Sequence, residues 1–140
     1  MNALIRKVTD PGSHDSLSSI GLLIFRVLTG GMMLIAHGWP KLAGFSKMSG
    51  GFPDPLGVGS PLSLTLAVFA EVVCSLAIIL GAFTRVAAIP LLITMLVAAF
   101  LVHAADPFNK KEFALLYAIP FFVLILTGAG KLSIDGKLKR

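Results

Sequence analysis

Four long apolar runs alternate with short polar connections along the chain. The runs cover about residues 20–42, 62–83, 86–105 and 113–129. Each is close to the roughly 20 residues that an α-helix needs to cross about 30 Å of hydrocarbon. Because lipid offers no partner to an unpaired backbone N–H or C=O group, we expect all four runs to be helical. The pattern predicts an all-α fold, an integral membrane four-helix bundle.

The segments between the runs predict how the helices connect. Residues 43–61 are rich in Gly, Pro and Ser and predict an outer loop, whereas Gly81–Arg85 and Asp106–Glu112 predict tight connections. Short connections favour antiparallel neighbours, so we expect an up-down antiparallel bundle in which residues 1–140 form a single membrane domain. Residues 1–19 are a polar N-terminal tail in this interpretation, without the pattern of a cleaved signal peptide.

Composition supports the membrane assignment, and the basic residues predict its orientation. Hydrophobic residues make up 56% of the chain and charged residues only 14%, too little charge to cover a soluble domain of this size. Lys and Arg are more numerous at the predicted end that carries both termini and the turn at Gly81–Arg85. The positive-inside rule therefore predicts that both termini are cytoplasmic. No basic stripe carries interleaved aromatic residues, so a nucleic-acid partner is not expected.

Ionisable side chains within the apolar runs are the candidate functional residues, because placing them in lipid is costly. At 100° per residue, Arg26, His37 and Lys41 fall within one wedge of the first helix about 80° wide. The alternative is that Arg26 and Lys41 extend to opposite interfaces of the membrane. The shared wedge favours an orientation toward the interior of the bundle.

Glu71 lies about nine residues into the second run, or about 14 Å below the outer interface at 1.5 Å per residue. This depth is close to the middle of the bilayer and within estimated reach of a long arginine, so we expect an Arg26–Glu71 ion pair or hydrogen-bonded pair. Ser75, one turn further, is an expected hydrogen-bond partner on the same face. The sequence leaves open whether this pair is a structural clasp or includes a proton-carrying or ligand-binding carboxylate.

Two further residues near the predicted interfaces and the cysteine of the second run have simpler interpretations. His103 ends the third run on the same side as His37, and two such histidines could hold a metal or a b-type haem. No further ligand cluster supports either, so neither a metal site nor haem is favoured over hydrogen-bonded interfacial histidines. Trp39 is expected in the interfacial aromatic belt. The one cysteine, Cys74, excludes an intramolecular disulfide, a CxxC pair and c-type haem attachment.

Several motifs follow one another with a recognisable order and spacing. They are LIFRVLTGGMMLIAHGWPKLAGF (residues 23–45), AVFAEVVCSLAIILGAFTRVAA (residues 67–88), the histidine that ends the third run, and GAGKLSIDGKL (residues 128–138). In this arrangement the chain resembles the DoxX family of small bacterial inner-membrane proteins, over about Leu22 to Leu138. Ala129 stands where the family's usual Gly-Pro-Gly motif has its proline.

The resemblance implies a multi-pass protein of the bacterial cytoplasmic (inner) membrane that is linked to redox processes. Related proteins include a subunit of an archaeal thiosulfate:quinone oxidoreductase, and others look like membrane partners in oxidative-stress and thiol-handling complexes. The family's characteristic polar residues fall on Arg26, His37, Lys41, Glu71 and Arg85. Arg85 enters this set through the resemblance alone, and a positive anchor at a tight turn is its other explanation.

Three functions stay open at this point. The first is a quinone-linked redox component with a polar intramembrane pocket, for which the candidate cofactor-binding residues are Arg26, His37, Trp39, Lys41, Glu71, Arg85 and His103. The chain has no flavin or nicotinamide fingerprint and no cysteine cluster, so electron transfer would need a soluble or membrane oxidoreductase partner, or a bound cofactor that the sequence does not indicate. The second is a non-enzymatic scaffold or assembly partner for a soluble oxidoreductase. The third is a small-molecule binder or transporter, for which a homo-oligomer through Gly30 and Gly31 is open. Whether the protein is an enzyme is not determined by the sequence.

Overall fold

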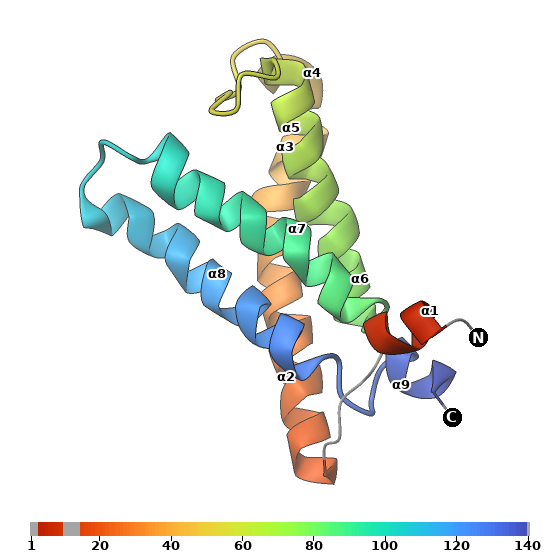
Figure 1. Ribbon diagram of the computed structural model, residues 1–140. Coiled ribbons are helices and arrows are strands. Elements are labelled where there is room, and N and C mark those ends of the chain that lie inside the picture. The colour runs from red at the N-terminus through yellow and green to blue at the C-terminus, as the bar shows by residue number, and fades with distance from the viewer. Residues whose placement is uncertain (1–2, 10–14, 140) are drawn as a thin grey trace.

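The computed structural model describes residues 3–9 and 15–139, and all regular structure within these ranges is helical. Four long helices dominate it, at Ser16–Ala43, Ser60–Leu80, Thr84–Val102 and Phe108–Thr127. Successive long helices run in opposite directions, as the colours of Figure 1 show. The short helices are α1 (Ala3–Val8), α4 (Phe45–Met48) and α9 (Ile134–Leu138).

Three of the long helices contain a short π-helical segment. The first consists of α2 (Ser16–Met33), the π segment η1 (Leu34–Gly38) and α3 (Trp39–Ala43). The second consists of α5 (Ser60–Val68), η2 (Phe69–Cys74) and α6 (Ser75–Leu80). The third consists of α7 (Thr84–Val97) and η3 (Ala98–Val102), whereas α8 (Phe108–Thr127) is α-helical throughout. A π turn holds more residues than an α turn, so each segment changes the direction in which the following side chains point.

Three of these helices are long and apolar enough to cross a membrane, namely Ser16–Ala43, Ser60–Leu80 and Thr84–Val102, with mean hydropathies of 1.9, 2.3 and 2.3. The remaining long helix, α8, begins at Phe108, ahead of the apolar run expected from residue 113. Its first turns therefore include Lys110, Lys111 and Glu112. These charges distinguish α8 in composition from the other three helices.

The outer surface of the long helices is apolar. Side chains such as Ile24, Ile35, Leu116 and Leu126 expose more than half of their surface. A soluble protein rarely leaves so much contiguous apolar surface uncovered, whereas a helix in a bilayer requires it. On the three helices that are long and apolar enough to cross a membrane, such side chains are suited to contact with lipid.

The long helices pack in pairs, α2 against α6 and α7 against α8. Figure 1 shows the α7–α8 pair inclined across the other pair, so that the two pairs diverge toward the end that carries the connection at residues 49–59. The shared core lies where they cross. Its buried members are Met33, Ala70, Cys74, Ile78, Ala87, Ala88, Leu91, Met95, Ala118, Phe121 and Leu124. Several of them are alanines, which permit close approach of the helices.

At the opposite end, the segment after α8 folds back onto the turn between α6 and α7 (Figure 1). The buried carboxylate of Asp135 accepts hydrogen bonds from the backbone N–H groups of Phe83 and Thr84 at 2.8 and 3.0 Å, and so caps the start of α7. The N–H of Asp135 donates to the Gly81 carbonyl at 2.9 Å. Gly81 has a left-handed φ of 69°, and a Cβ there would collide with the Arg26 guanidinium.

Candidate functional site

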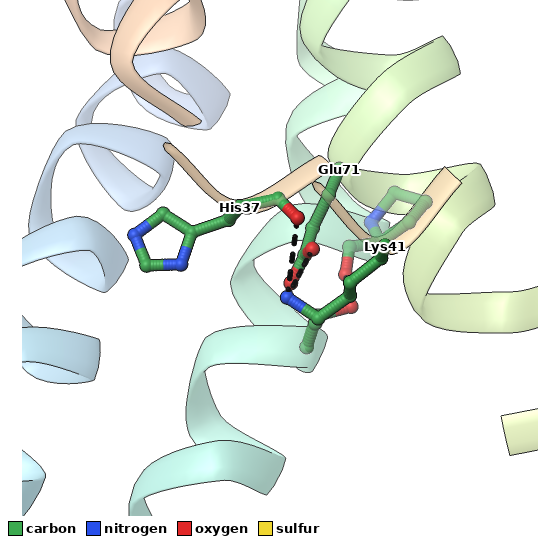
Figure 2. Close-up of polar contacts among 5 residues, drawn as sticks. His37, Lys41 and Glu71 are labelled. Atoms are coloured by element: carbon green, nitrogen blue, oxygen red, sulfur yellow. Dashed lines mark hydrogen bonds and ion pairs between the residues drawn. The ribbon is translucent and has the colours of Figure 1, made fainter. Parts of the chain in front are cut away.

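A buried ion pair joins the first and second long helices. The Lys41 Nζ atom lies 2.7 Å from Glu71 Oε2 and also donates to the His37 carbonyl at 3.4 Å. The side chain of Glu71 is only 4% exposed and that of Lys41 is 19% exposed. Figure 2 shows both charged groups meeting beside the helix backbone, while the His37 ring points away from them. A buried ion needs such a partner because removal from water is costly.

Gly38 explains how this pair can form. It is buried in η1, and a Cβ at this position would collide with the backbone carbonyl of Glu71. The two helices therefore touch backbone to backbone at Gly38, which only glycine permits. Lys41 follows within one turn, so its side chain reaches Glu71 directly.

A cavity of about 610 Å³ lies beside the ion pair, where the two helix pairs diverge. Its walls are mainly apolar, and residues of the 49–59 connection, including Phe52, Pro53 and Leu56, contribute to them. The polar side chains that line it are His37, Lys41, Ser63, Glu71, Thr94, His103, Lys110 and Tyr117. The volume lies within the range of about 300–1,000 Å³ found for small-molecule sites. All three π segments contribute wall residues, and such segments are frequent at functional sites.

An aromatic contact forms one wall of the cavity. The rings of His37 and Tyr117 meet edge to face, with centroids 5.1 Å apart and planes at 83°. On the other side of these two rings lies an apolar groove of about 590 Å³, between the first helix and α8. His37, Phe113 and Tyr117 line both spaces. The two spaces are therefore separated by side chains.

Asp54 fixes the connection that covers the loop end of the cavity. Its carboxylate accepts hydrogen bonds from the N–H groups of Val58 and Gly59 at 2.9 and 2.8 Å, and from the Ser63 hydroxyl at 2.9 Å. The bond from Gly59, followed by that from Ser63, lowers the pKa of Asp54 below its usual value. The ionised carboxylate thus ties residues 54–59 to the start of α5.

The structure brings together four of the predicted site residues and separates three. His37, Lys41, Glu71 and His103 line the cavity. Arg26, Trp39 and Arg85 do not line it. Trp39 is 61% exposed on the outer surface. Arg85 lies at the opposite end of the helices, where it donates to the carbonyls of Ile125 and Leu126 at 2.7 and 2.9 Å.

The predicted Arg26–Glu71 pair is wrong. Arg26 does face the interior and is fully buried, but it donates to the carbonyls of Leu132 at 2.6 Å and Ile78 at 3.2 Å. Ile78 lies seven residues beyond Glu71, about 10 Å along the helix axis. The depth estimate from straight helices therefore placed Arg26 too close to Glu71.

The predicted hydrogen bond between Ser75 and Glu71 is also not formed. The buried Ser75 hydroxyl has no partner within the described residues. Both residues are buried, but the Glu71 carboxylate pairs with Lys41 instead.

Tyr117 and Lys110 are cavity residues that the sequence analysis missed. Tyr117 is the only tyrosine of the chain and interrupts the apolar run of α8, which was its available signal. His103 is paired with Asp106, at 2.7 Å between Nδ1 and Oδ2. Among residues 3–9 and 15–139, no three His, Cys, Asp or Glu side chains gather as metal ligands would.

Comparisons with known proteins add a family match and several relatives. A family model for DoxX matches residues 21–104, which include His37, Lys41 and Glu71 but not α8. The chain is 38% identical over 113 residues to an uncharacterized protein of Haemophilus influenzae, covering 75% of this chain and 81% of the relative. It is 31% identical over 128 residues to the inner membrane protein YqjF of Escherichia coli, covering 89% and 96% respectively. No solved structure matches the chain.

Proposed function

This chain belongs to the DoxX family and is a multi-pass protein of the inner membrane, and on that premise we propose that it is a quinone-linked redox component that binds a quinone beside Lys41 and Glu71. The observation that carries the proposal is a buried ion pair in the wall of an apolar cavity within membrane-spanning helices. Ionisable residues at such depth most often mark a ligand or proton site, because apolar packing serves stability at lower cost.

The donor set of the cavity fits a quinone. A planar quinone ring needs apolar walls, and its two carbonyl oxygens need hydrogen-bond donors. The donors here are the Lys41 ammonium, the His37 imidazole and the Tyr117 hydroxyl, and the last is bonded to no group in the described part of the chain. When bound, a quinone supplies two-electron, two-proton redox chemistry.

The residues of the site have distinct roles in this proposal. Lys41 holds the Glu71 carboxylate in place, and Glu71 is the group positioned to hold a proton beside the ligand. The 49–59 connection excludes water from the loop end, through side chains such as Phe52 and Leu56. Electrons come from a partner oxidoreductase, because the chain has no nucleotide-cofactor fingerprint.

The membrane topology is part of the same proposal. We take α8 as a fourth span in an up-down antiparallel four-helix bundle, with residues 1–140 as a single membrane domain and both termini in the cytoplasm. The 20-residue length of α8 and the location of α1 and α9 at one end (Figure 1) support this arrangement. On a Cys74→Ala background, Ser46→Cys should react with an impermeant thiol reagent from outside, and Lys137→Cys should not. The reverse reactivity would refute the orientation.

Ligand titration of the purified protein in lipid nanodiscs tests the quinone site. The probe is 2,3-dimethoxy-5-methyl-1,4-benzoquinone, and the signal is the fluorescence of Trp39, the only tryptophan of the chain. We expect saturable binding and a raised Tm, with affinity reduced by about tenfold or more in the Lys41→Met/Glu71→Gln double variant. Arg85→Gln, at the opposite end, is the matched control and should bind normally.

Absence of saturable quinone binding by the unaltered protein refutes the proposal. If the protein binds no quinone but co-purifies with a stoichiometric soluble oxidoreductase, the non-enzymatic scaffold function is supported instead. Uptake of a solute by vesicles that contain the protein would support the binder or transporter function. These readouts separate the three functions that the sequence leaves open.

A further inference from the structure

The apolar groove on the far side of His37 and Tyr117 has the shape and chemistry of a site for a hydrocarbon chain. We propose that this groove binds the tail of the ligand whose head lies in the cavity, so that the ligand class is a long-chain isoprenoid quinone. The inference rests on the proposed quinone site and adds the class of its ligand and the position of the tail.

The groove is hollow because of a glycine. It is lined by Val27, Leu28, Gly31, Met32, Ile35, Ala36, His37, Phe113 and Tyr117. At Gly31, no atom lies within 4 Å of the position that a Cβ would take. The adjacent Gly30 differs, because a Cβ there would press against Ile79 and the Ser75 carbonyl. Gly30 therefore serves helix packing, and Gly31 leaves space.

The groove adjoins the cavity at three shared side chains, those of His37, Phe113 and Tyr117. The Phe113 and Tyr117 rings are 6.3 Å apart between centroids, and the His37 ring meets Tyr117 by its edge. This partition consists of side chains, so the proposal requires only that rotation about their χ angles joins the two spaces. A head bound beside Lys41 can then extend its tail past His37 into the groove.

A hydrocarbon tail fits the groove better than a helix of a second copy does. Close helix contact in membranes is favoured by small residues spaced four apart. The residues four positions before and after Gly31 are Val27 and Ile35, which are bulky and 41% and 73% exposed. A narrow, flexible chain can enter the hollow at Gly31 between them, whereas a second helix would meet these side chains first.

Gly31→Leu tests the inference, with Gly21→Leu as the matched control. Both glycines lie within α2 and have open space around the Cβ position, but only Gly31 lines the groove. Leucine is a better helix former than glycine, so both variants should fold. The probes, in phosphatidylcholine nanodiscs, are the 6-decyl derivative of 2,3-dimethoxy-5-methyl-1,4-benzoquinone and the same ring without the decyl tail. We expect Gly31→Leu to weaken binding of the decyl probe by about tenfold and leave the tail-less probe unchanged.

The possible results separate the tail site from the head site. Equal affinity of the unaltered protein and Gly31→Leu for the decyl probe overturns the inference, and so does an equal loss for both probes. A loss of dimers in native mass spectrometry of Gly31→Leu also overturns it, since the groove then holds a second copy. Binding of neither probe by the unaltered protein refutes the proposed function itself.

Photolabelling of the unaltered protein tests the tail site without any substitution. A decyl-type probe with a diazirine at the tail end should photolabel the peptides that contain Leu28–Ala36 or Phe113. Labelling confined to peptides outside the groove overturns the proposal.

Discussion

Replacing Lys41 alone in the Lys41–Glu71 pair is expected to destabilise the protein more than replacing both partners. Lys41→Met leaves the 4% exposed carboxylate of Glu71 without its cation. Glu71→Gln leaves an ammonium that is 19% exposed and carried by a flexible stem, so it can move toward the loop end and water. We therefore expect Lys41→Met to be the more damaging single change, and the double variant to recover most of the stability.

The magnitude follows from the contact distance and the burial. At 2.7 Å the attraction is about 6 kcal/mol for an effective dielectric constant of about 20. Desolvation of several kcal/mol per ion offsets most of it, so the intact pair contributes little net stability. Removing one partner of a buried pair costs about 3–5 kcal/mol. Because this pair is partly exposed, we expect a loss of about 3 kcal/mol for Lys41→Met and about 1 kcal/mol for Glu71→Gln. The double variant should lose about 1 kcal/mol, which gives a coupling of about 3 kcal/mol.

Reversible unfolding by SDS in mixed micelles, followed by the fluorescence of Trp39, measures the free energy of unfolding for the four proteins of this cycle. The quinone titration is then repeated on the double variant, whose fold is expected to be intact. A pair that only supports the fold leaves quinone binding intact in the double variant, whereas a binding pair does not.

Additive effects of the two single changes refute the energetic reasoning. A coupling below about 0.5 kcal/mol is within the range of independent sites, and would mean that Lys41 and Glu71 are not an energetic unit. A double variant less stable than Lys41→Met alone would contradict the argument in the same way.

The remaining predictions concern a buried arginine, two glycines and a loop carboxylate. Arg26→Met should destabilise the protein by about 3 kcal/mol through loss of its charged hydrogen bonds to the carbonyls of Ile78, Ile79 and Leu132. It should also raise the hydrogen exchange of residues 128–138, and unchanged protection there contradicts this role. Gly38→Ala should lower stability by about 1–3 kcal/mol because its Cβ meets the Glu71 carbonyl. Gly31→Ala should raise the stability of the protein by about 0.5–1 kcal/mol, because alanine is the better helix former and its Cβ meets no atom. Equal Tm values for Gly38→Ala and Gly31→Ala would refute the close contact of Gly38 with the Glu71 backbone. The lowered pKa of Asp54 means that its bonds contribute fully above the usual carboxyl pKa and are lost as the pH falls through the lowered folded value. Amide exchange at residues 58 and 59 should show this acid dependence, and Asp54→Asn should abolish it.

The helical class and the interior orientation of Lys41 and Glu71 could be predicted because they depend on local properties of the sequence. Apolar runs of membrane length leave few options other than helices, and an ionisable residue inside such a run is conspicuous. The pairing of these two residues could not be predicted from a straight helical projection. The π segments η1 and η2 change the directions in which nearby side chains point around the helix axis. Gly38 also brings the backbones of the first and second long helices into contact.

The partners of Arg26 lay beyond sequence reasoning for a different reason. The guanidinium donates hydrogen bonds to the backbone carbonyls of Ile78 and Leu132. Because every residue has a backbone carbonyl, the residue types in the sequence do not indicate which ones Arg26 contacts. Tyr117 was missed because an aromatic residue in an apolar run is most often lipid-facing. Only the crossing of the two helix pairs directs it into the cavity.

The contact between Arg26 and Leu132 has a consequence for biogenesis. The two residues are 106 positions apart, so the first long helix enters the membrane well before its carbonyl partner is synthesised. Until then the nascent chain contains a guanidinium in an apolar setting without that partner, a feature typical of an unfinished membrane protein. Docking of residues 128–138 supplies it, and the same segment caps α7 through Asp135. We therefore expect a chain truncated before Leu132 to leave the buried Arg26 guanidinium without this carbonyl partner.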